Sequence, residues 1–120
     1  MKDVLVVEDN PLVREIILSC LSQLRARVRT TTTAEEAIVA IRASKPDLVL
    51  CDVLLPGRSG VDLIGHLRAH AMTRELPVIA VTTLSGADSA NKLRAAGFTD
   101  VIGKPVDPVT FVAQIGKRLK

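Results

Sequence analysis

The sequence predicts an α/β fold, a doubly wound sheet of five parallel strands with five helices, in the strand order 2-1-3-4-5 counted along the chain. Two observations predict it. Short β-branched runs alternate with longer segments whose apolar residues recur at helical spacing. The first, third and fourth runs are almost continuously apolar, as strands buried on both faces are. The second and fifth runs are poorer in apolar residues, so we expect these two strands at the edges of the sheet.

The length and composition indicate one globular domain, residues 1–120. The chain has 48% apolar and 24% charged residues, enough for one core and too few for two. Its net charge is +3, but aromatic residues make up only 2% of the chain, too few to stack on bases. We therefore expect no direct nucleic-acid partner. The apolar run at residues 4–7 is too short for a signal peptide or a membrane span, which favours a cytoplasmic protein with no membrane partner.

The amino-terminal elements follow the alternating pattern. Residues 4–7 form the first strand, and Pro11 opens the first helix. Seven residues are expected to form the apolar stripe of this helix: Leu12, Val13, Ile16, Ile17, Cys20, Leu21 and Leu24. A second strand spans about residues 28–32, and Thr33 with Glu36 forms a capping box at the start of the second helix. Cys20 and Cys51 each lie in an apolar run, which indicates buried, reduced thiols.

The remaining elements alternate in the same way. We expect strands at residues 48–51, 78–81 and 101–102, and helices at about 61–70, at about 87–96 and from 108 onward. Gly97 ends the second of these helices. Asp107 is expected to cap the last helix, with Pro108 at its first position. His66 and His70 lie four residues apart and offer two metal ligands, but no third ligand is near in sequence, so we expect a solvated face.

Charged and polar side chains follow four of the predicted strands. Glu8 and Asp9 follow the first strand, Asp52 follows the third, Thr82 ends the fourth and Lys104 follows the fifth. In an open parallel sheet, ligands bind outside the carboxyl ends of the strands, at the switch point between the first and third strands. We therefore expect these side chains to converge on one site.

Three carboxylates in one place predict a bound cation, because they would otherwise repel one another. Mg²⁺, with Mn²⁺ as an alternative, suits such a set and leaves coordination positions open for phosphate oxygens. A lysine and a threonine hydroxyl on the opposite side would neutralise and hydrogen-bond those oxygens, as phosphoryl transfer requires. Asp52 is then the natural nucleophile, forming an aspartyl phosphate.

Four segments carry a family resemblance, in the order VLVVEDN, LVLCDVLLPGRSG, PVIAVTT and VIGKP. Together they resemble the receiver domain of bacterial two-component response regulators, of the chemotaxis-regulator-like, stand-alone type. The resemblance covers essentially all 120 residues and implies a flavodoxin-like fold. It also implies that the protein is not a dedicated enzyme, but a phosphoacceptor that assists its own phosphorylation and dephosphorylation.

The resemblance further implies partners and ligands. Asp52 would accept a phosphoryl group from a histidine kinase or a histidine phosphotransfer protein. Asp9, Asp52 and the backbone carbonyl of Leu54 would ligate Mg²⁺, and Glu8 would do so through water. A downstream protein would bind the face formed by the fourth helix, fifth strand and fifth helix. Phosphorylation-driven homodimerisation is left open.

The phosphoryl group would contact Thr82 and Lys104, and the peptide bond between Lys104 and Pro105 would be cis. Two positions nearby depart from the family pattern. Val101 stands where the family usually has an aromatic switch residue, so that output would depend on backbone shifts around residues 82–87 or be weakly coupled. Thr83 replaces a small residue and could crowd the phosphoryl group, although its backbone N–H can still donate to that group.

Leu54 and Leu84 form a third departure. They occupy the two positions that, in the family, help set how fast water attacks the phosphoaspartate. Apolar side chains neither orient a water molecule nor act as a base. We therefore predict a long-lived phosphorylated state.

Other functions fit the sequence less well. A phosphatase of the haloacid dehalogenase type needs a second Asp two residues after the nucleophile, where this chain has Leu54. A dinucleotide-binding fold needs G-x-G-x-x-G after the first strand, and EDNP stands there instead. The main alternative is a receiver-like binding module that works without phosphate, suggested by Val101 and Thr83. We expect a single-domain response regulator without a DNA-binding domain, because the last helix ends with the chain.

Overall fold

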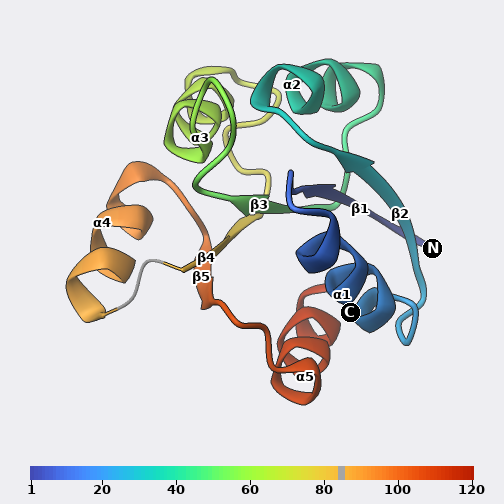
Figure 1. The fold of residues 1–120 in the computed structure, drawn as a ribbon. Helices are drawn as coiled ribbons and strands as arrows, with labels where there is room; N and C mark the ends of the chain where they lie inside the picture. Colours follow the sequence, from blue (N-terminus) through green and yellow to red (C-terminus); the bar gives the residue numbers. More distant parts are fainter. Residues whose placement is uncertain (84–85) are drawn as a thin grey trace.

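The computed structural model describes residues 1–83 and 86–120 and has three layers, with a parallel sheet between two layers of helices (Figure 1). The strands are β1 (Lys2–Val7), β2 (Ala26–Thr31), β3 (Leu48–Asp52), β4 (Val78–Thr82) and β5 (Asp100–Gly103). The helices are α1 (Pro11–Leu21), α2 (Ala34–Ala43), α3 (Gly60–Ala69), α4 (Ala87–Ala96) and α5 (Pro108–Arg118). The strand order is β2-β1-β3-β4-β5 and every pair is parallel, so the predicted fold class and strand order are confirmed.

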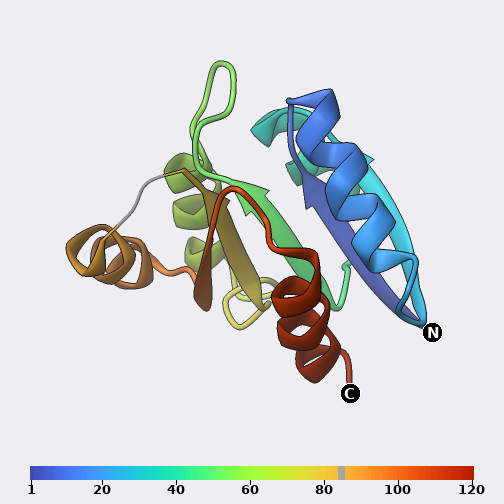
Figure 2. The same cartoon turned by 60° about the horizontal axis from the view of Figure 1, so that its bottom comes forward.

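Two apolar clusters attach the helices to the sheet. Helices α1 and α5 cover one face, and α2, α3 and α4 lie on the other (Figures 1 and 2). Successive residues of a strand point to opposite faces. In β1, Leu5 and Val7 therefore pack on the α2 side, while Val4 and Val6 pack on the α1 side. Every residue of β3 and β4 is buried, as their continuous apolar runs predict.

The edge strand β2 explains why arginines occur within a strand. β2 is only partly buried, as predicted for an edge, and it begins at Ala26, two residues earlier than expected. The Arg29 guanidinium reaches the end of α2, where it donates to the carbonyl oxygens of Ala40 at 3.0 Å and Ser44 at 2.6 Å. The Ala40 carbonyl lies in the last turn of α2 and also accepts the backbone N–H of Ser44 at 3.1 Å, while Ser44 directly follows the helix. Arg29 thus links the edge strand to the helix that follows it.

The predicted apolar stripe of α1 is wrong at two positions. Leu12 is 76% exposed and Ile16 is 45% exposed, whereas Ile17, Cys20 and Leu21 are buried. Leu12 and Ile16 lie four residues apart, so they form one row on the helix surface, beside the row that meets the sheet. The apolar stripe is therefore wider than the area that the sheet covers.

Two predicted helix caps differ in detail. The Thr33 hydroxyl accepts the N–H of Glu36 at 3.1 Å, as expected, but the Glu36 carboxylate bonds Thr32 rather than Thr33. The predicted capping box is therefore only half formed, because the hydrogen bond from the Glu36 side chain goes to the residue before the N-cap. Asp107 stands at the N-cap of α5, yet its carboxylate accepts the hydroxyl of Thr110 at 2.6 Å and no backbone N–H. A side-chain hydroxyl three residues on has replaced the backbone donor of that turn.

Both cysteines are free and buried, as the sequence predicts. Burial raises the pKa of the Cys20 thiol and, together with the charges of Asp52 and Glu8, that of the Cys51 thiol. Both sulfurs therefore stay protonated at neutral pH. None of the helices in the described ranges combines the length and the apolar character needed to cross a bilayer. The cytoplasmic location stays a prediction.

Gly97 gives a direct test of how α4 ends. Its φ is +124°, and a Cβ atom there would lie 2.9 Å from Cγ of Arg68. Gly97→Ala is expected to lower the free energy of unfolding by roughly 1–3 kcal/mol, because the backbone conformation is strained for alanine. Urea unfolding followed by far-UV circular dichroism measures this, since the chain has no Trp or Tyr to report by fluorescence.

The matched control is Gly65→Ala, within α3. A Cβ at Gly65 would meet nothing within 4 Å. Alanine there should raise the free energy of unfolding by about 0.5–1 kcal/mol, because glycine is a poor helix former. Equal effects of the two substitutions would contradict the conformational argument for Gly97.

Candidate functional site

Asp52 lies at the carboxyl end of β3, between β1 and β4. The residue is only 7% exposed. Its Oδ1 accepts the backbone N–H of Leu54 at 3.1 Å, and its Oδ2 lies 3.3 Å from Nζ of Lys104. A buried carboxylate is costly unless it is paired and hydrogen-bonded. Both of these conditions are met, which answers why a charge can end an apolar strand.

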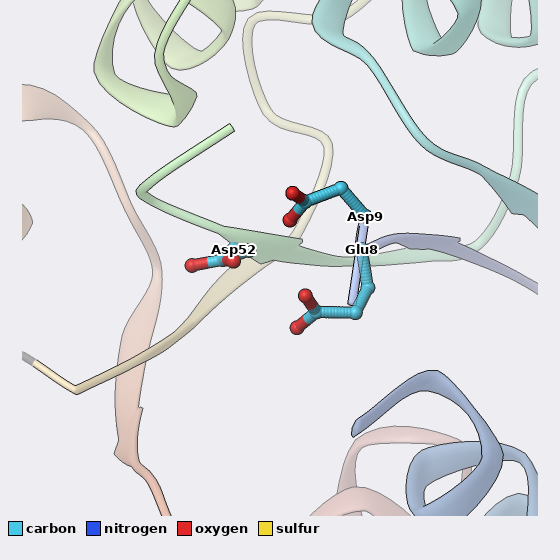
Figure 3. Close-up of side chains that lie close together, drawn as sticks. All are labelled: Glu8, Asp9 and Asp52. Atoms are coloured by element: carbon cyan, nitrogen blue, oxygen red, sulfur yellow. The ribbon is translucent and has the colours of Figure 1, made fainter. Parts of the chain in front are cut away.

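Glu8 and Asp9 bring two further carboxylates to the same place. Both residues directly follow β1, with Glu8 buried and Asp9 exposed. Figure 3 shows their side chains extending from the end of β1 toward the end of β3, which carries Asp52. One carboxylate oxygen from each of the three residues lies within 4.8 Å of the others. We call Glu8, Asp9 and Asp52 the acidic cluster, and the predicted convergence of the three residues is confirmed.

Lys104 supplies the positive charge beside the acidic cluster. Its Nζ lies 2.8 Å from Oε1 of Glu8 and 3.3 Å from Oδ2 of Asp52, and its side chain is 11% exposed. The backbone N–H of Lys104 donates to the carbonyl of Thr82 at 2.8 Å, which joins the ends of β5 and β4. The Lys104–Pro105 peptide bond is cis. The ends of β1 and β3 therefore meet at the Lys104 ammonium group, and the Lys104 backbone joins the ends of β4 and β5.

The pKa values in the cluster are set by burial and by charge. Burial raises the pKa of Glu8, and the nearby charge of Asp52 adds to this, while hydrogen bonds from Lys104 and Asn10 oppose it; the net pKa is raised. Burial lowers the pKa of Lys104, but the hydrogen bond to Glu8 and the two negative charges outweigh it and raise the net pKa. Lys104 therefore stays protonated, and three carboxylates face one ammonium group.

The other predicted site residues surround this arrangement. Thr82 is fully buried at the end of β4, and Thr83 is exposed after it. The Leu54 side chain is 59% exposed, although its backbone N–H is held by Asp52. Val101 is half-buried in β5 and packs on the α2-side apolar cluster. Leu84 lies outside the described residues, and the roles of all five residues stay predictions.

Two supporting residues were missed by the sequence analysis. Arg14 donates from a guanidinium nitrogen to the carbonyl of Glu8 at 3.1 Å. Gly60 begins α3 so close to β3 that a Cβ there would lie 2.5 Å from the carbonyl oxygen of Asp52. Gly60 has a signal in the sequence, as a glycine in the turn after Asp52. Arg14 has none, because its position on the flank of α1 resembles any exposed arginine.

The arrangement suits a hard divalent cation and a phosphate. Its donor set consists of carboxylate oxygens, which Mg²⁺ and Mn²⁺ prefer. Asp9 is exposed, so the cluster can be reached from solvent. The negative charge that Lys104 leaves uncompensated is the electrostatic reason for a cation to bind there.

An acidic cluster beside a lysine, at the carboxyl end of a doubly wound parallel sheet, is the arrangement of the receiver domain family, whose members are phosphoacceptor signalling modules. Residues 4–116 match the family model of the response regulator receiver domain, and the chain belongs to this family. The fold and the resemblance predicted from the sequence are therefore confirmed.

Similar proteins include both longer and equally short members. The phosphate regulon transcriptional regulatory protein PhoB of Escherichia coli is 34% identical over 112 residues, which cover 93% of this chain and 49% of PhoB. The chain thus spans about half the length of that protein. The polar-differentiation response regulator DivK of Brucella anthropi is 31% identical over 114 residues, covering 95% of this chain and 93% of DivK. A receiver domain of a histidine kinase from Syntrophus aciditrophicus superposes with a TM-score of 0.88 at 28% identity, covering 99% and 90% of the two chains.

Removing the ammonium group tests how much the acidic cluster depends on it. Lys104→Met leaves Glu8 buried without a cation, and we expect a loss of roughly 3 kcal/mol in the free energy of unfolding at pH 7 without divalent ions. An acid whose folded pKa is raised binds its proton more tightly in the folded state, so this loss should shrink as pH falls toward 5. Urea unfolding at both pH values measures it.

Lys92→Met on the exposed face of α4 is the matched control and should cost little. The double variant Lys104→Met with Glu8→Gln should recover part of the lost stability, because Glu8 then carries no buried charge and only Asp52 still lacks its ammonium partner. A Lys104→Met protein as stable as Lys92→Met at pH 7 would contradict the dependence of Glu8 on Lys104.

Proposed function

We propose that Asp52 accepts a phosphoryl group from a histidine kinase or a histidine phosphotransfer protein, in a reaction that requires Mg²⁺. The observation that carries this proposal is the position of the Asp52 carboxylate, beside two other carboxylates and 3.3 Å from the Lys104 ammonium. Membership of the receiver domain family supports it.

The proposed reaction is a displacement at phosphorus. An oxygen of Asp52 forms the new O–P bond while the N–P bond of a phosphohistidine breaks and its electron pair returns to the imidazole nitrogen. The Lys104 ammonium offsets the negative charge of the incoming phosphoryl oxygens. The Thr82 hydroxyl and the Thr83 backbone N–H donate hydrogen bonds to the same oxygens. In this way the chain assists its own phosphorylation and, with water as the attacking group, its dephosphorylation.

The metal would be held by the acidic cluster. Asp9, Asp52 and the carbonyl of Leu54 are the proposed direct ligands, and Glu8 acts through water. Mg²⁺ is the expected ion and Mn²⁺ an alternative, since both take oxygen ligands in octahedral geometry. When bound, the ion supplies the positive charge that lets three carboxylates and a phosphoryl group share one site.

The phosphodonor would approach over the start of α1. Leu12 and Ile16 form an exposed apolar row on α1, a few residues after Asp9. Val109, at the start of the neighbouring α5, is 80% exposed. Exposed apolar groups on α1 and α5 give a partner protein a surface to bury. Leu12 and Ile16, which the sequence predicted to be buried, thus fit a binding surface for a kinase or phosphotransfer protein.

The proposed output surface is the face of α4, β5 and α5. Helix α4 buries Leu93 as its one fully buried residue in the described chain, so most of its surface is available. Asp100 at the start of β5 pairs with Arg94 at 3.3 Å and with Arg118 at 3.6 Å, which ties the three elements together. A downstream protein, or a second copy of the chain, would bind this face. The likeness to DivK, a response regulator covered over 93% of its length, supports a role as a response regulator.

A second candidate is a binding module that works without phosphate. Val101 has no ring to rotate and is already packed on the α2-side apolar cluster. Thr83 adds bulk at the entrance to the acidic cluster. These two residues favour the alternative, while Asp52, Lys104 and the other carboxylates favour phosphorylation.

Intact-mass spectrometry after incubation with acetyl phosphate tests the proposed function. One added phosphoryl group is expected in the wild-type protein with Mg²⁺, and none with EDTA. Asp52→Asn should give no adduct, because the amide is a poor nucleophile. Asp9→Asn should lower the yield by weakening the metal site, whereas the exposed Asp88→Asn is the matched control and should react normally.

No adduct in the wild-type protein would be decisive if Mg²⁺ binding were shown separately. A thermal shift that grows with Mg²⁺ concentration gives that evidence, since an ion that binds only the folded state stabilises it. That combination would replace the proposed function with the phosphate-independent module.

The lifetime of the adduct tests the role of Leu54. We expect the phosphorylated protein to last for minutes or longer in Mg²⁺ buffer, because an apolar side chain at this exposed position cannot orient the attacking water. Leu54→Asn should shorten the half-life, since its amide can hold a water molecule. Loss of the adduct is followed by mass spectrometry after the donor is removed, and a wild-type half-life of seconds would contradict the prediction.

A further inference from the structure

A hollow of about 470 Å³ lies between the carboxyl ends of α2 and α3. Its floor is apolar and includes the buried side chains of Ile38, Ile41 and Leu67, with Met72 exposed at its margin. The carboxyl ends of these helices lead into the starts of β3 and β4. The hollow, which we call the α2–α3 groove, therefore lies near the amino-terminal ends of the strands. Asp52 lies at their carboxyl ends, on the opposite side of the molecule.

The ionisable side chains of the α2–α3 groove are all basic. They are Arg42, Lys45, His66 and His70, and no acidic side chain lines the groove in the described part of the chain. Within the same residues, Arg42 makes no hydrogen bond or ion pair. Lys45 reaches across to the carbonyl of Met72 at 3.4 Å. The groove thus has an apolar floor and a positively charged rim.

The two histidines form one unit on this rim. Their rings lie 4.4 Å apart between centroids, and Nδ1 of His70 is 2.8 Å from the carbonyl oxygen of His66. That contact makes Nδ1 of His70 the donor nitrogen and leaves Nε2 free. His66 is half-buried rather than fully solvated, which refines the prediction of a solvated face.

Basic residues near helix carboxyl ends have a simpler explanation, because they interact well with the helix dipole. Here other groups already bond the terminal carbonyl oxygens. Arg29 bonds those of Ala40 and Ser44, and the Thr73 hydroxyl bonds that of Leu67 at 2.6 Å. Arg42 is therefore not needed as a cap. Its exposed charge beside an apolar hollow is therefore available to a ligand.

We propose that the α2–α3 groove binds a small amphiphilic anion, a carboxylate with an aliphatic or aromatic body. The groove volume lies in the range of roughly 300–1,000 Å³ that is typical of small-molecule sites. The apolar body would lie on Ile38, Ile41 and Leu67. The carboxylate would pair with Arg42 and with the histidine pair, and binding would not require phosphorylation of Asp52.

The charges around His66 predict that the affinity of the groove for a carboxylate depends on pH. Burial lowers the pKa of His66, and the positive charges of His70, Arg42 and Arg58 lower it further. These neighbours come from α3 itself, from α2 and from the loop before α3, and all carry positive charge when protonated. A bound carboxylate offsets them and favours the protonated ring. Binding should therefore tighten as pH falls from 8 to 6.

The experiment is a titration of the full ¹⁵N-labelled chain with sodium octanoate at constant ionic strength, followed by backbone amide NMR shifts. Shifts are expected at residues 41–45 and 70–73, with the amides of residues 52–54 unchanged. Octylammonium chloride, which has the same chain and the opposite charge, should not produce them. Arg42→Gln should weaken octanoate binding roughly three- to fivefold, as expected for one exposed ion pair.

Arg25→Gln, which removes the same charge from an exposed position outside the groove, should leave octanoate affinity unchanged. The double variant His66→Gln with His70→Gln should bind with little dependence on pH. Equal shifts from octylammonium, shifts spread over the whole molecule, or no binding at millimolar octanoate would overturn the proposal. A wild-type affinity that does not change between pH 8 and 6 would also overturn it.

Discussion

The contact of Lys104 with Glu8 and Asp52 is the interaction on which the functional end of this molecule depends. A parallel sheet brings the carboxyl ends of its strands to one edge, so acidic residues placed after β1 and β3 must meet. Without the ammonium, the nearly inaccessible Glu8 carboxylate would face Asp52 and lose its ion pair. The raised pKa of Glu8 records how costly its ionised form remains even with the lysine present. Lys104 thus offsets only part of the negative charge of the three carboxylates, and the remaining negative charge favours the uptake of a cation.

The surrounding fold holds these charges in place through backbone contacts rather than through further side-chain pairs. Arg14 and the N–H of Asn10 fix Glu8, the N–H of Leu54 fixes Asp52, and the carbonyl of Thr82 holds the backbone of Lys104. These contacts come from the last residue of a strand, from the first residues after a strand, or from the start of a helix. The two apolar clusters on either face of the sheet set where those segments lie. Burial of the central strands therefore holds in place the segments that carry the acidic cluster and Lys104.

The features that the sequence predicts well depend on patterns along a single element. Continuous apolar runs mark β3 and β4 as central strands, and polar residues at strand ends mark Asp52 and Lys104 as neighbours once the strand order is known. The features that it misses depend on how two elements meet. Leu12 and Ile16 have the spacing of core residues, but the sheet does not extend far enough to cover them. Arg14 is likewise ordinary until α1 is docked beside the end of β1.

Helix α3 physically connects the two ends of the molecule. It begins at Gly60, which is packed so closely behind Asp52 that no side chain fits between them, and it ends at the histidine pair of the α2–α3 groove. A capping box between Ser59 and Asp62 fixes the first turn, and Arg68 fixes the last by donating to the carbonyl oxygens of Gly97, Thr73 and Arg74. The same helix therefore packs against the end of β3 beside Asp52 with its first residue and forms one wall of the α2–α3 groove with its last turn.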